Sequence, residues 1–189
     1  MFAQRGYHSA TLDEVAEVAG FSKGAVYSNF SSKEDLFLAL QREREEGLIG
    51  AFGSAGQDVS DPSDLFSALR DVYAASRDRD EEWALWMEFT LFAMRKPKAR
   101  TKLAESSRSA HDMVVDLVKR QCRDDGVEPP ISPDLIACIY SALFTGLWQQ
   151  QAIDPDAVDD DAFAAAIVFM RQAIAALGHP RRTTRKRKA

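Results

Sequence analysis

The sequence predicts an all-α protein, on three observations. Apolar residues recur at helical spacing along most of the 189 residues. No stretch shows the sustained apolar–polar alternation of a strand, and no Asn-Gly hairpin turn occurs. Helix-breaking residues divide the chain into about eight helical stretches. The breaks fall at Gly6, Gly20, Ser31-Ser32, Gly53 to Pro62, Pro97, Gly126 to Pro133, Asp154 to Asp159 and Gly178 to Pro180.

The composition is that of a soluble globular protein, with 46% hydrophobic and 28% charged residues. No apolar run approaches the roughly 18 residues of a membrane helix, and Met1 to Arg5 has no signal-peptide character. A cytoplasmic protein without a membrane partner is therefore expected. The two cysteines, Cys122 and Cys138, and three histidines lack ligand spacing, which predicts buried free thiols, no metal and no cofactor.

Charge is spread unevenly over the chain. The net charge is −5, but six of the 24 basic residues lie in 181–189, leaving 18 against 29 acidic residues and a net −11 for 1–180. Such an acidic body does not suit a protein that coats nucleic acid everywhere. We expect 181–189 to be a basic disordered tail. The wide break from Gly53 to Pro62 predicts a short N-terminal domain, 1–47, and a larger domain, 48–180.

Two short helices joined by a tight turn are predicted in residues 11–30. Thr11 and Glu14 have the spacing of a capping box. The apolar face that follows ends at Gly20, a suitable C′ residue, and Phe21 is expected to plug the corner from inside. The face consists of Leu12, Val15, Ala16 and Ala19.

Ser22 is the expected cap of the second helix, Lys23 to Phe30, whose Val26 and Phe30 should face inward. Ser32 caps a third helix, which is predicted to bury Leu36, Phe37 and Leu40. This arrangement is a helix-turn-helix pattern.

A longer stretch around this pattern, about 36 residues, resembles the TetR family signature nearly position by position. The matching segments are Phe2 to Tyr7, Ala10 to Leu12, Val15-Ala16, Ala19 to Tyr27, Asn29-Phe30 and Ser32 to Leu36. The resemblance implies that 1–47 binds operator DNA and that 48–180 binds a small effector and forms a homodimer. It also implies that only the end of the family's first helix is present, and acidic residues outnumber basic ones in 1–41.

The resemblance implies that Ser22 to Asn29 enter the major groove. Lys23 and Ala25 could meet base edges, Gly24 would allow close approach, hydroxyl groups and Lys33 suit phosphates, and Asn29 could do either. Each residue also has a plainer role, since Thr11 and Ser22 can be caps, Tyr27 a half-buried aromatic and Lys33 a solvated lysine. The candidate DNA contacts are Thr11, Ser22, Lys23, Gly24, Ala25, Tyr27, Ser28, Asn29 and Lys33.

The stretch from Glu82 to Arg95 is apolar around almost its whole circumference, so a central helix is expected. In the family the equivalent domain holds an effector between helices, and the helices 98–124 and 134–151 could complete a pocket. Core packing is the alternative for each residue. Glu88 could meet a cationic ligand, pair with an arginine such as Arg95 or Arg100, or lie at the helix edge. The candidate effector contacts are Trp83, Trp86, Met87, Thr90, Met94, Met113, Tyr140 and Phe144.

The last two helices, 134–151 and 159–177, have apolar stripes too wide for helices with one neighbour, which predicts a dimer interface. The resulting hypothesis is a regulator, in the family's usual mode a repressor, released from its operator by an effector; an activator stays open. The first alternative is a helical ligand-binding or scaffold dimer that does not bind DNA. An enzyme is disfavoured, because no nucleophile–base pair, phosphate loop or metal cluster is evident.

Overall fold

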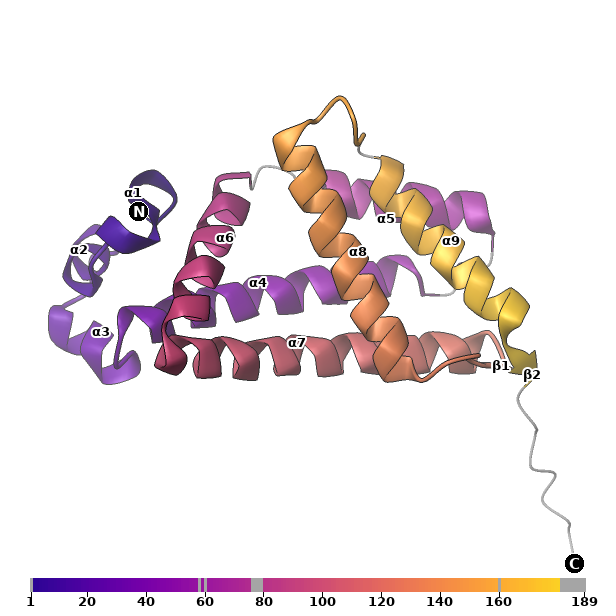
Figure 1. Ribbon diagram of the computed structural model, residues 1–189, viewed down its shortest axis with the longest axis horizontal. Helices are drawn as coiled ribbons and strands as arrows, with labels where there is room; N and C mark the ends of the chain where they lie inside the picture. Colours follow the sequence, from indigo (N-terminus) through magenta and orange to yellow (C-terminus); the bar gives the residue numbers. More distant parts are fainter. Residues whose placement is uncertain (1, 58, 60, 76–79, 160, 181–189) are drawn as a thin grey trace, which may run out of the picture. The chain divides into compact units, whose positions relative to one another are not determined.

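The computed structural model describes residues 2–57, 59, 61–75, 80–159 and 161–180, and nine helices make up most of them (Figure 1). The all-α prediction is confirmed, while the predicted tail, 181–189, lies outside the described residues. The helices are α1 (Phe2–Ser9), α2 (Leu12–Val18), α3 (Lys23–Asn29), α4 (Lys33–Ala55), α5 (Pro62–Ala75), α6 (Asp80–Arg95), α7 (Pro97–Asp124), α8 (Pro133–Ile153) and α9 (Asp161–Leu177).

The chain packs as two compact units. The first comprises the described residues of Met1–Leu48 and Ser76–Ala110, and the second comprises those of Ile49–Ala75 and His111–Ala189. The long helices α4 and α7 each contribute residues to both units. The predicted boundary at residue 47 separates α6 from the N-terminal helices, whereas in the structure α6 packs with them. That boundary, as a division between two functions, stays a prediction.

An aromatic cluster forms the centre of the first unit. Tyr7 of α1, Phe37 of α4 and Phe89 of α6 are at most 1% exposed, and their ring centroids lie 4.5 to 5.3 Å apart. Phe2 and Trp86 pack against Phe37 at its edge and face. Because large aromatic rings bury much apolar area and prefer tilted packing, this cluster fixes the short α1 against α4 and α6.

In the second unit α9 packs against both α5 and α8, and Figure 1 shows α8 and α9 as antiparallel neighbours. Two buried clusters lie here, one around Ile136 and Ile174 and one around Leu69 and Ala164. A two-residue ladder joins β1 (Val127–Glu128) to β2 (His179–Pro180), which the sequence did not predict.

Several burial predictions are wrong. Phe21 is 65% exposed instead of plugging the corner, and Leu40 is exposed while Leu38 of the same helix is buried. Cys122 is buried as expected, but Cys138 is exposed. The described residues contain no helix that is both long and apolar enough to cross a membrane.

Candidate nucleic-acid interface

The helix α2 begins with the predicted capping box. The Thr11 hydroxyl oxygen accepts the Glu14 N–H at 3.3 Å, and the Glu14 carboxylate accepts the Thr11 N–H at 3.0 Å. The Glu14 carboxylate also accepts the Thr11 hydroxyl proton. The helix ends before Gly20, whose φ of 72° lies in the left-handed region that glycine tolerates best. The start and the end of α2 are therefore both set by local sequence chemistry.

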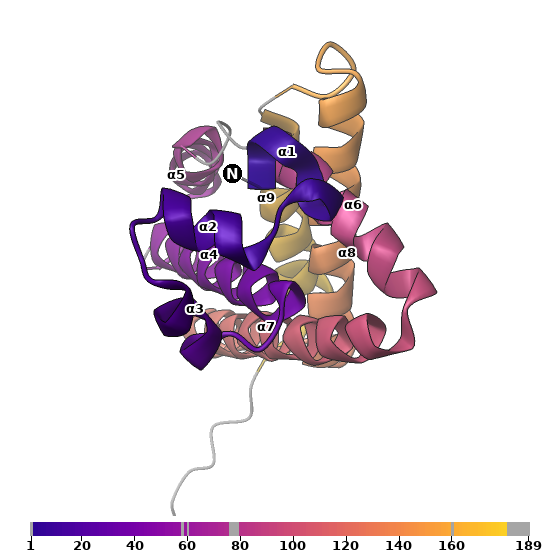
Figure 2. The same ribbon diagram turned by 90° about the vertical axis from the view of Figure 1, so that its left-hand side faces the viewer.

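The helix α3 presents a polar face to solvent. Ser22 caps it by accepting the Ala25 N–H at 3.2 Å, and Val26 is its buried residue. The Ser28 hydroxyl and the Asn29 amide both donate to the Ala25 carbonyl. Figure 2 shows α2 and α3 as two short helices joined by a turn. The exposed residues of this segment are Ser22, Lys23, Gly24, Ala25, Tyr27, Ser28 and Asn29.

Lys23 and Tyr27, both candidate DNA contacts, share an acidic neighbour on α2. The Lys23 ammonium donates to the Asp13 carboxylate at 2.6 Å, across the turn. The hydrogen bond from Lys23 lowers the pKa of Asp13. The nearby Asp13 carboxylate raises the pKa of Tyr27. The sequence reasoning did not single out Asp13, although it lies ten residues before Lys23 on the other helix of the motif.

Lys33, expected to meet phosphate, is directed partly into the protein. Its Nζ donates to the backbone carbonyls of Tyr7 at 2.7 Å and His8 at 3.1 Å, and it lies 4.5 Å from the Tyr7 ring centroid. Burial lowers the pKa of this lysine. The contact satisfies carbonyls at the end of α1 and links them to the first turn of α4. Its role toward DNA stays a prediction.

The same end of α1 is held from α6 by Glu88. The Glu88 carboxylate accepts the Tyr7 N–H at 2.9 Å and the His8 N–H at 3.3 Å. These amides are presented because Gly6 has a φ of 75° and interrupts the helical path. Among the described residues Glu88 does not pair with Arg95 or Arg100, one of the alternatives for it: its hydrogen-bond partners are backbone groups about 80 residues earlier in the chain, and His8 Nε2 lies 3.9 Å from its carboxylate.

A third polar link joins α7 to the turn between α3 and α4. Lys102 donates to the Asp35 carboxylate at 2.6 Å and to the Ser32 hydroxyl at 3.2 Å, while the Ser31 hydroxyl also donates to Asp35. The bond from Lys102 is the main reason that the pKa of Asp35 falls to about 2. The turn that follows α3 is thus held by a charged side chain of α7.

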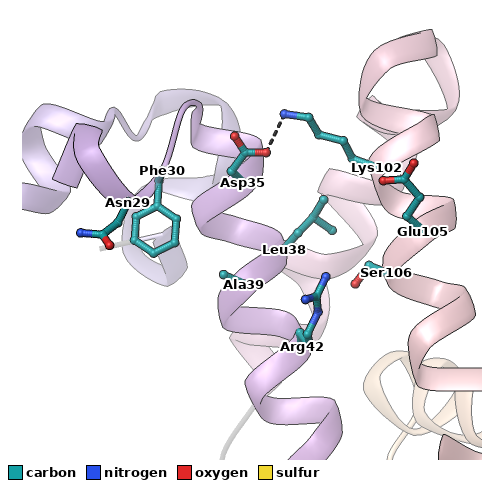
Figure 3. Close-up of a pocket in the computed structure, with 9 residues that line it drawn as sticks. All are labelled: Asn29, Phe30, Asp35, Leu38, Ala39, Arg42, Lys102, Glu105 and Ser106. Atoms are coloured by element: carbon teal, nitrogen blue, oxygen red, sulfur yellow. Dashed lines mark hydrogen bonds and ion pairs between the residues drawn. The ribbon is translucent and has the colours of Figure 1, made fainter.

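An open cavity of about 300 Å³ lies beside this link (Figure 3). Figure 3 shows Lys102 reaching toward Asp35 across it, with Arg42 on the α4 side. Positive and negative side chains line it in equal number, so it has no strong preference for a charged ligand. Its lining residues are Asn29, Phe30, Asp35, Leu38, Ala39, Arg42, Lys102, Glu105 and Ser106.

Five of the eight candidate effector contacts belong to α6 in the first unit. Trp86 stacks on Phe37 in the aromatic cluster, which favours a core role. Met94 is 64% exposed, and Trp83 and Met87 are half-buried. The Thr90 hydroxyl is buried and has no hydrogen-bond partner among the described residues. A buried hydroxyl without a partner is costly, so Thr90 is the α6 candidate whose environment favours a ligand most.

The other three candidates belong to the second unit. Phe144 packs edge-on against Phe163 and Trp148 in an aromatic group. Tyr140 has a buried hydroxyl without a hydrogen-bond partner in the described part of the chain, and burial raises its pKa. Met113 is half-buried. Within this unit, Tyr140 alone of the three combines a buried polar atom with an unmet hydrogen bond.

Comparison with known proteins defines the class to which this fold belongs. A family model described as bacterial regulatory proteins, tetR family, matches residues 1–40, and one described as BetI-type transcriptional repressor, C-terminal, matches residues 63–178. The fold and its helix-turn-helix are thus those of a DNA-binding transcriptional regulator. The second match alone spans more than half of the chain, and the chain belongs to the TetR family.

Curated relatives agree with this assignment, and a solved structure agrees with the fold. The transcriptional activator FasR of Mycolicibacterium smegmatis is 28% identical over 82% of this chain and 71% of its own length. The transcriptional repressor AcnR of Corynebacterium diphtheriae is 27% identical over 82% and 77%. A putative TetR-family regulator from Rhodococcus sp. superposes with a TM-score of 0.69, at 20% identity over 92% of each chain.

Proposed function

We propose that this chain is a homodimeric repressor that binds a palindromic operator through α3 and is released by a small-molecule effector. The observation that carries the DNA part is the face of α3. Its residues from Lys23 to Asn29 are exposed except for Val26, and they follow a helix fixed by its own cap. A short exposed helix rich in small and polar side chains suits the major groove, which admits one helix.

The effector part rests on α6. Thr90 offers a buried hydroxyl with an unmet hydrogen bond among the described residues, next to half-buried Met87. An effector with an apolar body and one polar group would satisfy that hydroxyl and cover the apolar side chains around it. Because α6 also carries Glu88, which holds the end of α1, a ligand that shifts α6 would disturb the DNA-binding helices directly.

The dimer part rests on α8 and α9. Large apolar residues on these helices are exposed in the single chain, with Phe169 at 69%, Leu177 at 66% and Leu135 at 50%. Exposed apolar side chains on neighbouring helices suit a two-fold helical interface. Two copies would present two recognition helices, and a palindrome requires such a pair.

A mobility-shift assay with DNA flanking the gene tests this function. The full chain should retard a specific fragment at a protein concentration at which a scrambled duplex of the same composition stays free. Ser28→Ala together with Tyr27→Phe should weaken the specific shift at least about tenfold, because two hydroxyl contacts are lost. Glu128→Gln, a change far from α3 in sequence, serves as control. Equal retardation of both duplexes by the wild-type chain would refute the proposal.

A second candidate, a ligand-responsive dimer that does not bind DNA, is favoured by one observation. Both lysines assigned to DNA contacts already have partners within the protein, Asp13 for Lys23 and two carbonyls for Lys33. Since affinity for DNA depends on cations that meet phosphates, such a surface would bind weakly. The same assay separates the two, because this candidate predicts no shift of any fragment.

A further inference from the structure

The helix-turn-helix contains an acidic residue, Asp13, in direct contact with one of its candidate DNA contacts, Lys23. Asp13 lies in the first turn of α2, and Lys23 lies at the start of α3. Their side chains meet at 2.6 Å and stay accessible, Asp13 at 42% and Lys23 at 67%. Tyr27, one turn later on α3 and 54% exposed, lies close enough for Asp13 to raise its pKa. One carboxylate of α2 thus pairs with a candidate DNA contact of α3.

We propose that Asp13 is a specificity-determining residue: it orients Lys23 toward base edges and cancels the charge that Lys23 would otherwise offer to any phosphate. This inference rests on the proposed function, because it requires that α3 binds an operator. It assigns to Asp13 a role that acts through Lys23.

The orienting part follows from the donor count of an ammonium group. Lysine carries three N–H donors, and the Asp13 contact uses one of them. The two others can reach a guanine acceptor while the carboxylate is kept. A free lysine must lose much side-chain freedom when it binds, whereas the pair with Asp13 restricts that freedom before DNA arrives. The loss of Asp13 should therefore remove the part of the operator affinity that comes from the orientation of Lys23.

The neutralisation of Lys23 by Asp13 affects binding to every DNA sequence. Non-specific binding depends almost wholly on protein cations that displace counterions from phosphates. The Asp13 carboxylate neutralises Lys23 and also repels phosphates itself. Glu17, on the same helix, adds a weaker attraction for Lys23. Removing Asp13 frees one lysine for non-specific contacts, so random DNA gains affinity while the operator gains less.

The test compares two duplexes by fluorescence anisotropy over a series of salt concentrations. One duplex is selected by the full chain from a random-sequence pool, and the other has the same bases scrambled. For Asp13→Asn, the ratio of operator affinity to scrambled affinity should fall at least about threefold. The salt dependence on scrambled DNA should steepen by about one in log–log slope.

Two further variants isolate the mechanism. Glu17→Gln removes the same charge from the same helix but no hydrogen bond to Lys23, so it should lower the ratio much less than Asp13→Asn. In a Lys23→Met background, Asp13→Asn should have no effect on the ratio, because its action requires the lysine. An unchanged or higher ratio in Asp13→Asn, an equal fall in Glu17→Gln, or an effect that persists without Lys23 would each overturn the inference. A wild-type chain without operator preference would instead refute the proposed function.

Discussion

The Glu88 carboxylate accepts the backbone N–H of Tyr7 at 2.9 Å, which links α6 to α1, the helix that precedes the helix-turn-helix. Lys33, at the start of α4, donates to the Tyr7 carbonyl. The backbone at Tyr7 is thus held by a charged group on its donor side and another on its acceptor side. Hydrogen bonds to charged groups are stronger than neutral ones, so these two contacts supply an anchor that the short α1 could not provide by itself.

Replacing Glu88 should therefore destabilise the first unit. Glu88→Ala leaves the Tyr7 amide without its acceptor, at a cost of about 1–3 kcal/mol in the free energy of unfolding. Glu88→Gln keeps a carbonyl acceptor but loses the charge, so its loss should be smaller. Urea denaturation followed by circular dichroism measures both. Equal stability of Glu88→Ala and the wild type would show that the contact does not anchor α1.

Any side chain at position 6 should lower the stability of the fold. The φ of 75° and ψ of 165° at Gly6 lie in a region that is nearly exclusive to glycine, and an added Cβ would lie 3.1 Å from Glu88 Oε2. Gly6→Ala should cost about 1–3 kcal/mol. Gly50→Ala in the helix α4, where a Cβ meets nothing within 4 Å, is the matched control and should stabilise by about 0.5–1 kcal/mol. Thermal unfolding of both variants provides the comparison.

The Lys102–Asp35 pair predicts acid sensitivity. The pKa of Asp35 falls from 3.8 to about 2, mainly because Lys102 binds its carboxylate. A depressed carboxyl pKa stabilises the fold above the unfolded value, and this stabilisation is lost as the pH falls from about 4 toward 2. The free energy of unfolding of Lys102→Met should fall less steeply than that of the wild type over that pH window. Lys98→Met, one turn earlier on α7, should keep the wild-type pH dependence. Parallel curves for Lys102→Met and wild type would contradict the assignment.

Glu45 predicts the opposite pH dependence. Burial raises its pKa from 4.5 to about 7. The folded chain then binds a proton more tightly than the unfolded chain, so this group lowers stability as the pH rises from about 4.5 to 7. Glu45→Gln removes this loss and should be more stable than wild type at pH 8 but similar at pH 4. The exposed Glu43→Gln on the same helix is the control, and a pH-independent difference for Glu45→Gln would rule out the titration.

The ends of the two helices of the helix-turn-helix were predicted well from local sequence chemistry. The capping box of Thr11 and Glu14 and the Ser22 cap involve partners three residues apart, and the structure confirms all of them. Such contacts depend on helix geometry alone, which a single sequence specifies. Gly20 ends α2 for the same reason, since its left-handed φ needs no tertiary partner.

Partners distant in sequence could not be predicted in the same way. The alternatives for Glu88 were a cationic ligand, an arginine on its own or the next helix, or the helix edge, yet it binds amides at Tyr7 and His8. Lys102 binds Asp35, 67 residues earlier. Periodicity also misplaced single side chains, because the apolar face of α4 buries Leu38 and exposes Leu40. Which face is buried depends on where α6 packs, and a helical pattern alone does not contain that information.

Footprinting of the full chain on DNA that it selects tests the central claim most directly. A dimeric TetR-type repressor should protect two symmetric half-sites whose centres lie about one helical turn apart. Lys23→Ala should weaken protection most at the base pairs next to α3 while the site stays centred. Protection without sequence preference, or of a single unpaired half-site, would contradict the account.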